Sequence, residues 1–397
     1  MLATKSKHTA VAAEDIESRT ARWQRAFALC AGKTRVNIRR LADAPKSAAY
    51  SEAGNYFEFA EGFFEISNWT SSFFTGMALL AWQETEDEYF LRQTSRLAPT
   101  YHEKIFKHPA DTMHDLGFLY SLYSVGLYKL TGDKSHREVG LRAAEVLAGR
   151  FVANGGYIRA WGRMDEHRTD YAGLAIIDCM MNLPLLYWAS KETGDKKFRD
   201  IAVHHADTTL KYFVRPDDSV FHAFRFDLKT GKPVGGDNYC GYSVESHWAR
   251  GAAWAIYGFA LSYGYTHDKK YLAAALRLAH KFVSCLDAEV VPVWDFKLPA
   301  GEKPLRDSSA AAIAVCGFQE LATHNVADRE ILKAKNSLLD RLCSSDYLDF
   351  NVDFNDLCLG VLKKGQIGGP KNAFTSWGDY FLMEALSREL KIGETFW

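Results

Sequence analysis

A helix, a tight turn and a second helix recur along this 397-residue chain, and the repeat constrains the fold more than any other feature. On both sides of each turn, apolar residues recur at three- and four-residue spacing, which is typical of amphipathic helices. The three clearest turns begin at Thr131, Thr193 and Thr266 and read TGD, TGD and THD. At the first turn, Thr131-Gly132-Asp133 ends one helix, and Asp133 or Ser135 is placed to cap the next. The same helix–turn–helix unit returns at the other two turns, so each predicts a helical hairpin.

The spacing of the turns favours a closed ring of hairpins over an open array. The intervals are 62 residues (131 to 193) and 73 residues (193 to 266), longer and less regular than the repeats of TPR or HEAT solenoids. The connections between hairpins are long, rich in Gly, Trp, His and Asp, and all fall on one side of the repeat. Connections of this length in a compact domain usually carry function. They cover residues 153–170, 215–248 and 287–309.

About six hairpins fit between the first and last helical segments. We therefore expect an all-α fold, an (α/α)6 barrel of six helical hairpins with a loop-built cleft at one end. Residues 1–397 would form a single catalytic domain, in which residues 1–20 are a loosely ordered N-terminal extension.

Charge and cysteine content exclude several classes of protein. The 48 basic and 49 acidic residues give a formal net charge of -1, which argues against nucleic acid or an anionic membrane as partner. No run of 18 apolar residues and no signal peptide is found in the sequence. The seven dispersed cysteines form no CxxC pair and no metal-ligand spacing, a pattern typical of reduced thiols. We expect a cytoplasmic protein, either a monomer or a weak homodimer.

Asp115 opens an apolar helix within the segment MHDLGF. An aspartate at this position most often caps the helix, and that structural explanation stays open. Asp178 lies within LAIIDCMMNLPL, which we predict to be a strongly apolar helix. Burial of a carboxylate raises its pKa, as a general acid working near neutral pH requires. The alternative for Asp178 is a structural carboxylate paired with an arginine or a helix end.

Aromatic residues make up 14% of the chain, with ten tryptophans. They suit a packed core and also a carbohydrate cleft, and composition does not separate the two. Arg250 and Trp254 are four residues apart and share a helix face. An arginine can bind a sugar carboxylate in bidentate fashion while the indole stacks on the ring, although stacked Arg–Trp packing is common as well.

Several segments together resemble the unsaturated glucuronyl hydrolases, glycoside hydrolase family 88. They are HDLGF, the aspartate 63 residues after Asp115, WARGAAWAIYGF, DSSAAAIA and SWGDYFLMEAL. The resemblance covers the chain from about Trp69 to Leu386, with the motifs in the family's order and spacing. It implies an (α/α)6 barrel and a glycosidase that needs neither a metal ion nor an organic cofactor.

The resemblance also implies the reaction. These enzymes remove a 4,5-unsaturated uronic acid from the non-reducing end of lyase-generated oligosaccharides by hydrating its C4=C5 vinyl ether. The aspartate matching Asp178 protonates C4 and activates the water that adds to C5, and the one matching Asp115 assists. The matching sugar-binding residues are Trp69, His114, Trp161, His222, Arg250 and Trp254, with Ser246 and Ser376 as further candidates.

Two positions depart from the family pattern. Cys240 stands where the family commonly has glutamine, and Ala252 where it has the glutamine of RGQAW. Loss of an amide near the sugar could change which uronyl substrate fits. The alternatives are an unsaturated rhamnogalacturonyl hydrolase, against which the HDLGF motif argues, a sugar epimerase with paired histidines, and a non-catalytic helical-repeat scaffold.

Overall fold

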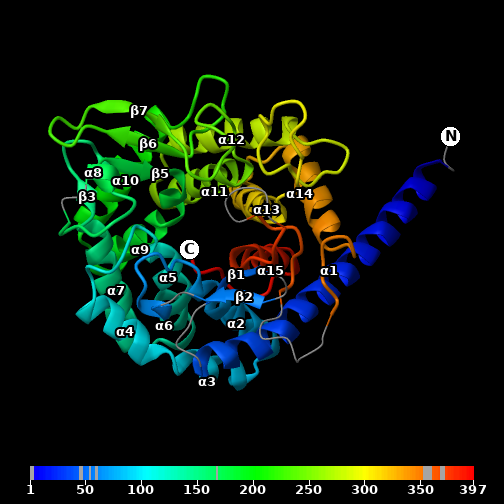
Figure 1. The fold of residues 1–397 in the computed structure, drawn as a ribbon. Helices are drawn as coiled ribbons and strands as arrows, with labels where there is room; N and C mark the ends of the chain where they lie inside the picture. Colours follow the sequence, from blue (N-terminus) through cyan, green and yellow to red (C-terminus); the bar gives the residue numbers. More distant parts are fainter. Residues whose placement is uncertain are drawn as a thin grey trace.

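The repeated hairpins close into a double ring of helices (Figure 1). The computed structural model describes residues 4–43, 48–52, 55–58, 61–166, 169–351, 360–366 and 372–397. Within these ranges six inner helical segments contact one another in a circle, and the last contacts the first. They are α2 (Ser71–Thr85), α5 (Leu116–Tyr120) with its continuation α6 (Gly126–Thr131), α9 (Leu183–Thr193), α11 (Ala249–Thr266), α13 (Ser308–Thr323) and α15 (Ser376–Leu390).

An outer layer of amphipathic helices covers the inner ring. Helix α11 is buried at every position from Ala249 to Ser262, whereas α14 buries mainly one face, which includes Ile331 and Leu338. A helix surrounded by others is apolar all round, and a helix with one wet face is not. The outer helices are α1 (Thr4–Asp43), α3 (Glu88–Ser95), α4 (Ala98–Lys107), α7 (Lys134–Ala148), α10 (Lys196–Tyr212), α12 (Lys269–Ser284) and α14 (Arg329–Leu342).

The predicted turns are confirmed in detail. Asp133 caps α7 by accepting a hydrogen bond from the backbone N–H of Ser135 at 2.8 Å. Asp195 and Asp268 cap α10 and α12 in the same way. Gly132 adopts a left-handed conformation with φ of 71°, which glycine reaches without steric cost. Each turn therefore reverses the chain in few residues, and inner and outer helices pack side by side.

Short strands occur in the connections that the sequence predicted to be loops and in the first half of the helix predicted around Asp178. Strands β5 (Leu174–Ile176), β6 (Ala223–Phe226) and β7 (Pro233–Asp237) form an antiparallel sheet in the order β5-β6-β7. The remaining short elements are β1 (Ala48–Glu52), β2 (Asn55–Glu58), β3 (Phe151–Val152), β4 (Tyr157–Ile158), α8 (Thr169–Ala172) and the 3-10 turn Gly62–Phe64.

The prediction of a helix around Asp178 is wrong for the first half of that segment. Residues Leu174–Ile176 pair with β6, and Asp178 lies in the 3-10 turn Ile177–Met181 before α9 begins at Leu183. β-branched isoleucines favour a strand, and the backbone N–H of Ile177 donates to the carbonyl of His222 at 2.9 Å. Tertiary pairing therefore overrides the apolar pattern.

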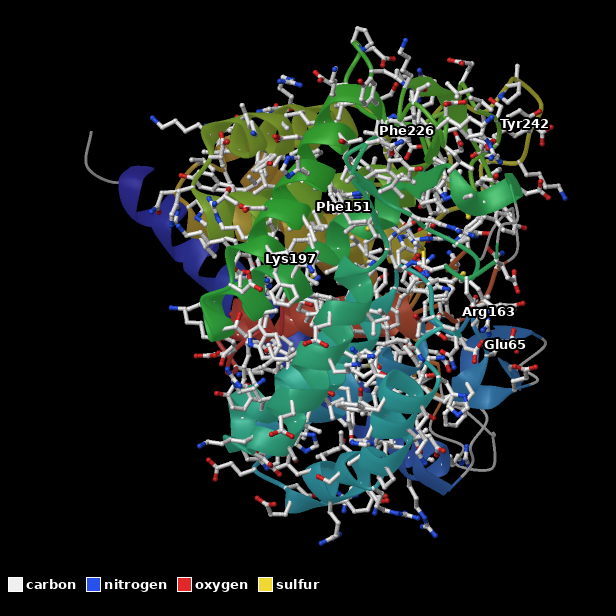
Figure 2. All side chains as sticks on the ribbon, turned by 90° about the vertical axis from the view of Figure 1, so that its left-hand side faces the viewer. Glu65, Phe151, Arg163, Lys197, Phe226 and Tyr242 are labelled. Carbon is white, nitrogen blue, oxygen red and sulfur yellow. The ribbon has the colours of Figure 1, made fainter. Side chains whose placement is uncertain are left out.

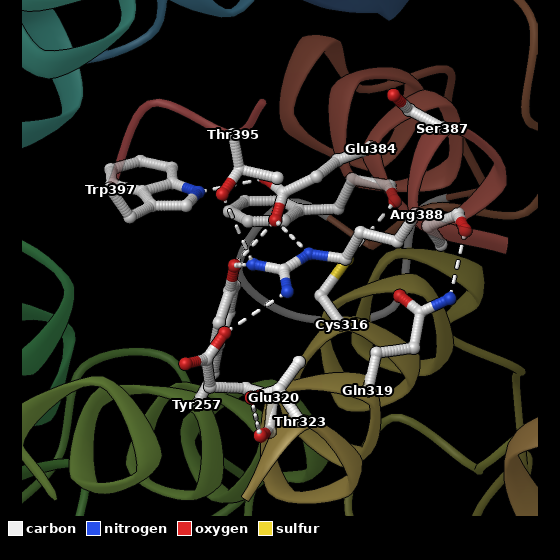
Figure 3. A network of polar contacts seen from close by, with 12 residues as sticks. Tyr257, Cys316, Gln319, Glu320, Thr323, Glu384, Ser387, Arg388, Thr395 and Trp397 are labelled. Atoms are coloured by element: carbon white, nitrogen blue, oxygen red, sulfur yellow. Dashed lines mark hydrogen bonds and ion pairs between the residues drawn. The ribbon is translucent and has the colours of Figure 1, made fainter. Parts of the chain in front are cut away.

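The chain ends inside the ring (Figure 1). There, the buried Glu384 accepts hydrogen bonds from Arg388 at 3.1 Å and from the indole N–H of Trp397 at 2.7 Å (Figure 3). Glu384 also accepts from the hydroxyl of Tyr257. Arg388 pairs with Glu320 as well, at 3.0 Å. Both charges of Glu384 and Arg388 are thus paired and hydrogen-bonded, as buried ions require.

Helix α1 runs through most of the segment that the sequence predicted to be an N-terminal extension. Its N-terminal part reaches beyond the ring (Figure 1), while its later part contacts α2, α3 and α15. Among the described residues, no helix combines the length and the apolar character that crossing a membrane demands.

Candidate active site

A cavity of about 630 Å³ opens at the end of the barrel that carries the long connections. Figure 2 shows Arg163, which lines this cavity, at the same end of the molecule as Glu65 and Tyr242. A cavity of this size accommodates a ligand as large as a disaccharide. Eight of the ten predicted site residues line it: Trp69, His114, Asp115, Trp161, Asp178, His222, Arg250 and Trp254.

Asp115 and Asp178 lie close enough for their charges to interact. Burial, together with the charge of Asp178, raises the pKa of Asp115 to about 8, so Asp115 carries a proton at neutral pH. Asp115 occupies the N-cap position of α5, yet its side chain accepts no cap hydrogen bond. The sequence predicted a raised pKa at Asp178, which stays a prediction. Asp115 is the more deeply buried of the two, with its side chain 11% exposed against 19% for Asp178.

Gly117 and Asn182 bring the two carboxyl-bearing segments together. The side-chain oxygen of Asn182 accepts a hydrogen bond from the backbone N–H of Phe118 at 2.8 Å. Its side-chain nitrogen donates to the carbonyl of Asp178 at 3.3 Å. A Cβ atom at Gly117 would stand 2.4 Å from the Cα atom of Asn182, so only glycine permits this approach.

His222 lies between the sheet and Asp178. Its Nδ1 atom accepts hydrogen bonds from the backbone N–H groups of Tyr239 at 3.0 Å and Cys240 at 3.2 Å. Its Nε2 atom lies 3.7 Å from Oδ2 of Asp178. Burial lowers the pKa of His222, but Cys240 and Asp178 raise it by more, to about 9, which would favour a charged ring at neutral pH. The hydrogen bonds oppose that charge, because a proton on Nδ1 would point at the two backbone N–H groups that Nδ1 accepts from. We therefore assign a neutral ring with its proton on Nε2.

His114 stands beside the other carboxyl group. Its Nε2 atom lies 3.4 Å from Oδ1 of Asp115. Burial and the charge of Arg150 hold the pKa of His114 well below its usual value. The ring is therefore neutral, so its contact with Asp115 is not an ion pair.

Arg250 already has a carboxylate partner within the chain. Its guanidinium donates to Asp307 at 2.7 Å and to the carbonyl of Gln366 at 2.6 Å. It lies over the rings of Trp248 at 4.6 Å and Trp377 at 5.4 Å. A buried guanidinium is stabilised by a carboxylate and by ring faces, so these contacts hold Arg250 in place at the cavity wall. Trp254 packs against Phe118, with ring centroids 5.3 Å apart.

Ser246 and Ser376 are absent from the described lining of the cavity. Ser246 is buried and donates a hydrogen bond to Asp295 at 2.6 Å. Ser376 begins α15, with its hydroxyl 3.5 Å from the carbonyl of Thr70. Both hydroxyls hold backbone segments in place, which a sequence pattern does not distinguish from ligand binding.

Aromatic rings form much of the cavity wall. Trp69 stacks on Trp377 with ring centroids 4.8 Å apart. Trp161 lies between Tyr171 and Tyr239, at 5.7 and 4.7 Å, in edge-to-face contacts. Such rings offer flat apolar faces next to the two carboxyl groups. In the part of the chain that the structure describes, no group of three or more His, Cys, Asp or Glu residues is placed to hold a metal ion.

Comparison with known proteins places this geometry in a family. The model of Glycosyl Hydrolase Family 88 matches residues 44–336. The chain belongs to glycosyl hydrolase family 88. An unsaturated glucuronyl hydrolase of Bacillus sp. (strain GL1) is 34% identical over 378 residues, 92% of this chain and 96% of that protein. An unsaturated chondroitin disaccharide hydrolase of Streptococcus pyogenes serotype M1 is 35% identical, with 83% of each chain covered.

Solved structures of the family superpose on the whole barrel. The crystal structure of unsaturated glucuronyl hydrolase from Bacillus sp. GL1 matches with a TM-score of 0.85 and 32% identity, covering 94% of this chain and 99% of that one. The enzyme from Streptococcus agalactiae matches with a TM-score of 0.84 and 31% identity, covering 95% and 94%. The family, the hydrolase class and the helical barrel that the motifs predicted are confirmed.

Several residues that line the cavity of this family 88 protein were not predicted from the sequence. Trp248 precedes the arginine of the WARG motif and was the easiest to find, because the motif includes it. Asp111 and Arg163 form an ion pair at the cavity wall, and nothing in their sequence context signals it. Of the two departures from the family pattern, Cys240 lines the cavity, whereas Ala252 is buried and is not among its described lining residues. The roles of all site residues stay predictions.

Proposed function

We propose that this family 88 protein removes the 4,5-unsaturated uronic acid from the non-reducing end of lyase-generated oligosaccharides. The observation that carries the proposal is the pair of Asp115 and Asp178 in an aromatic-walled cavity, with a pKa of about 8 on Asp115. Interacting carboxyl groups titrate as a pair, so this pair keeps one proton at neutral pH. A vinyl ether needs such a proton donor for its hydration.

In the proposed reaction, Asp178 protonates C4 and then takes a proton from the water molecule that adds to C5. One water molecule is thereby added across the C4=C5 bond, and Asp178 is protonated again. The resulting hemiketal opens to a ketone and leaves a hemiacetal at C1, which breaks down to an aldehyde and the free hydroxyl of the next sugar. The anomeric carbon is not attacked, so the carboxyl separation rules of retaining and inverting glycosidases do not apply.

We assign Asp115 to supply the shared proton to Asp178. In the resting site, the deeper burial of Asp115 keeps the shared proton on it, so only one of the two carboxyl groups is charged when the anionic sugar binds. Neutral His222, with its proton directed at Asp178, supports the carboxylate form that accepts the proton of water. The aromatic wall formed by Trp69 and Trp161 would bind the C–H faces of the sugar.

The proposal is tested with unsaturated disaccharides generated by lyases from chondroitin, heparin, gellan, alginate and plant gums. Loss of the ultraviolet absorbance of the C=C bond reports hydration, which an epimerase or a scaffold would leave unchanged. We expect turnover of at least one uronyl disaccharide. Turnover of pectin-derived ends alone would favour a rhamnogalacturonyl hydrolase, and absence of any turnover would refute the proposal. A relative from Streptococcus agalactiae was solved in complex with dGlcA-GalNAc6S, which makes chondroitin products the first to assay.

We also propose that the enzyme is cytoplasmic and acts as a monomer or a weak homodimer, without nucleic acid or membrane as partner. The balanced charge of the chain supports this proposal. So do the six free cysteines that the structure describes, because disulfides are rare in the cytosol. Cell fractionation and light scattering of the purified protein test these two points.

A further inference from the structure

An exposed tyrosine stands beside the cavity, just outside its described lining. Tyr239 is 39% exposed. Its ring lies 4.7 Å from Trp161 and 6.0 Å from His222, centroid to centroid, and both of those residues line the cavity. Trp161 thus contacts Tyr171, which also lines the cavity, and the exposed Tyr239.

The Tyr239 ring is held at both ends. Its hydroxyl donates to Asp237 at 3.0 Å and accepts from Arg225 at 2.6 Å. Arg225 and Asp237 pair with each other at 2.5 Å, and they belong to neighbouring strands β6 and β7. The backbone N–H of Tyr239 donates to His222.

The hydrogen bonds of the Tyr239 hydroxyl fix the orientation of its ring, whereas an exposed side chain ordinarily keeps its rotamer freedom. An aromatic face that is already ordered loses little entropy when a ligand covers it, so its binding is stronger. Tyrosine is well suited to this use, because it offers a large contact area with only two rotatable bonds.

We infer that Tyr239, which lies next to Trp161 but outside the cavity lining, forms an outer subsite that binds the third sugar of longer unsaturated oligosaccharides by stacking on its C–H face. The inference rests on the proposed function. The unsaturated residue occupies the cavity beside Asp115 and Asp178, and the reducing-end sugars extend past Trp161 toward solvent. Tyr239 lies beyond the cavity wall, so it meets a sugar that a disaccharide lacks.

The test compares kcat/KM on an unsaturated disaccharide and an unsaturated tetrasaccharide prepared from the same polymer. For Tyr239→Ala we expect the tetrasaccharide-to-disaccharide ratio to fall about three- to tenfold, the range of one aromatic contact, mainly through KM. Tyr239→Phe keeps the ring and loses the two hydrogen bonds of the hydroxyl. Its tetrasaccharide-to-disaccharide ratio should therefore lie between that of the wild type and that of Tyr239→Ala. Tyr242→Ala is the matched control, since Tyr242 is 42% exposed in the same connection and should leave the ratio unchanged.

An unchanged tetrasaccharide-to-disaccharide ratio in Tyr239→Ala would overturn the inference. If kcat/KM also fell equally on both substrates, the variant would have disturbed His222. Wild-type protein that turns over neither substrate, nor any disaccharide of the panel, would refute the proposed function, and the inference with it. Normal disaccharide turnover with an unchanged ratio refutes the outer subsite alone. Circular dichroism of each variant verifies that the barrel is intact.

Discussion

The backbone N–H of Phe118 donates a hydrogen bond to the side-chain oxygen of Asn182 at 2.8 Å, across 64 residues of sequence. This bond ties the first turn of α5, which follows Asp115, to the turn that carries Asp178. Gly117 makes this close approach of the two segments possible, because a Cβ atom at its position would collide with Asn182. The relative position of the two carboxyl groups therefore depends on residues that carry no charge.

Gly117→Ala should separate the two segments. The added methyl group would stand 2.4 Å from a backbone atom of Asn182, and such overpacking costs about 1–3 kcal/mol. We expect a lower Tm and a loss of activity larger than the stability loss explains. Gly32→Ala on α1 is the control, since a Cβ there meets nothing within 4 Å. Equal activity in both variants would show that the contact does not position the carboxyl groups.

Asp178→Asn should lower kcat by about 10²–10⁴-fold, the usual contribution of a group that transfers a proton. The amide preserves the shape of the side chain, so the thermal unfolding curve should stay close to that of the wild type. Hydration assays on the unsaturated disaccharide measure the loss. Retention of more than a small fraction of the activity would assign the proton transfer to Asp115 instead.

Asp115→Asn should increase stability in a pH-dependent way. The folded state raises the pKa of Asp115 from 3.8 to about 8. Between these values the folded protein holds a proton that the unfolded chain has lost, so this group makes stability fall as pH rises. The variant lacks this loss, and its advantage in Tm should be small at pH 4 and reach about 2–5 °C at pH 8. Wild-type activity should decline above about pH 8, as the shared proton is lost.

Asp307→Ala should destabilise the barrel by about 3–5 kcal/mol, because it leaves the guanidinium of Arg250 buried without its carboxylate. Both side chains are almost fully buried, at 3% and 0% exposure. Glu145→Ala, which removes an exposed ion pair with Arg142, should change stability by less than about 1 kcal/mol. Urea unfolding measures both variants, and similar values for the two would contradict a structural role for the buried pair.

Glu384→Gln should weaken the network inside the ring (Figure 3). Glu384 accepts hydrogen bonds from three side chains while fully buried, so its neutral replacement should cost about 2–4 kcal/mol. The same change at Glu389, which lies on the same helix and is 17% exposed, should cost about 1 kcal/mol. Urea unfolding measures both variants, and an equal loss of stability in the two would contradict a central role for Glu384.

The sequence by itself determined the helical hairpins. Their apolar spacing and the turns at Thr131, Thr193 and Thr266 depend on contacts within a few residues, so local chemistry was sufficient to place them. The aspartate caps of α7, α10 and α12 were readable for the same reason. The motifs around Asp115 and Arg250 were likewise sufficient to indicate the family.

Only the tertiary structure decided the character of the two carboxyl groups. Asp178 appeared to be the buried one because its neighbours are apolar, yet pairing of β5 with β6 turns it toward the cavity and leaves it partly exposed. Asp115 appeared to be a cap, and closure of the ring around it gave it the raised pKa. Arg250 found Asp307, 57 residues away, as its partner. Burial and pairing arise between segments distant in sequence. A local sequence pattern therefore does not show which of the two carboxyl groups is the more deeply buried.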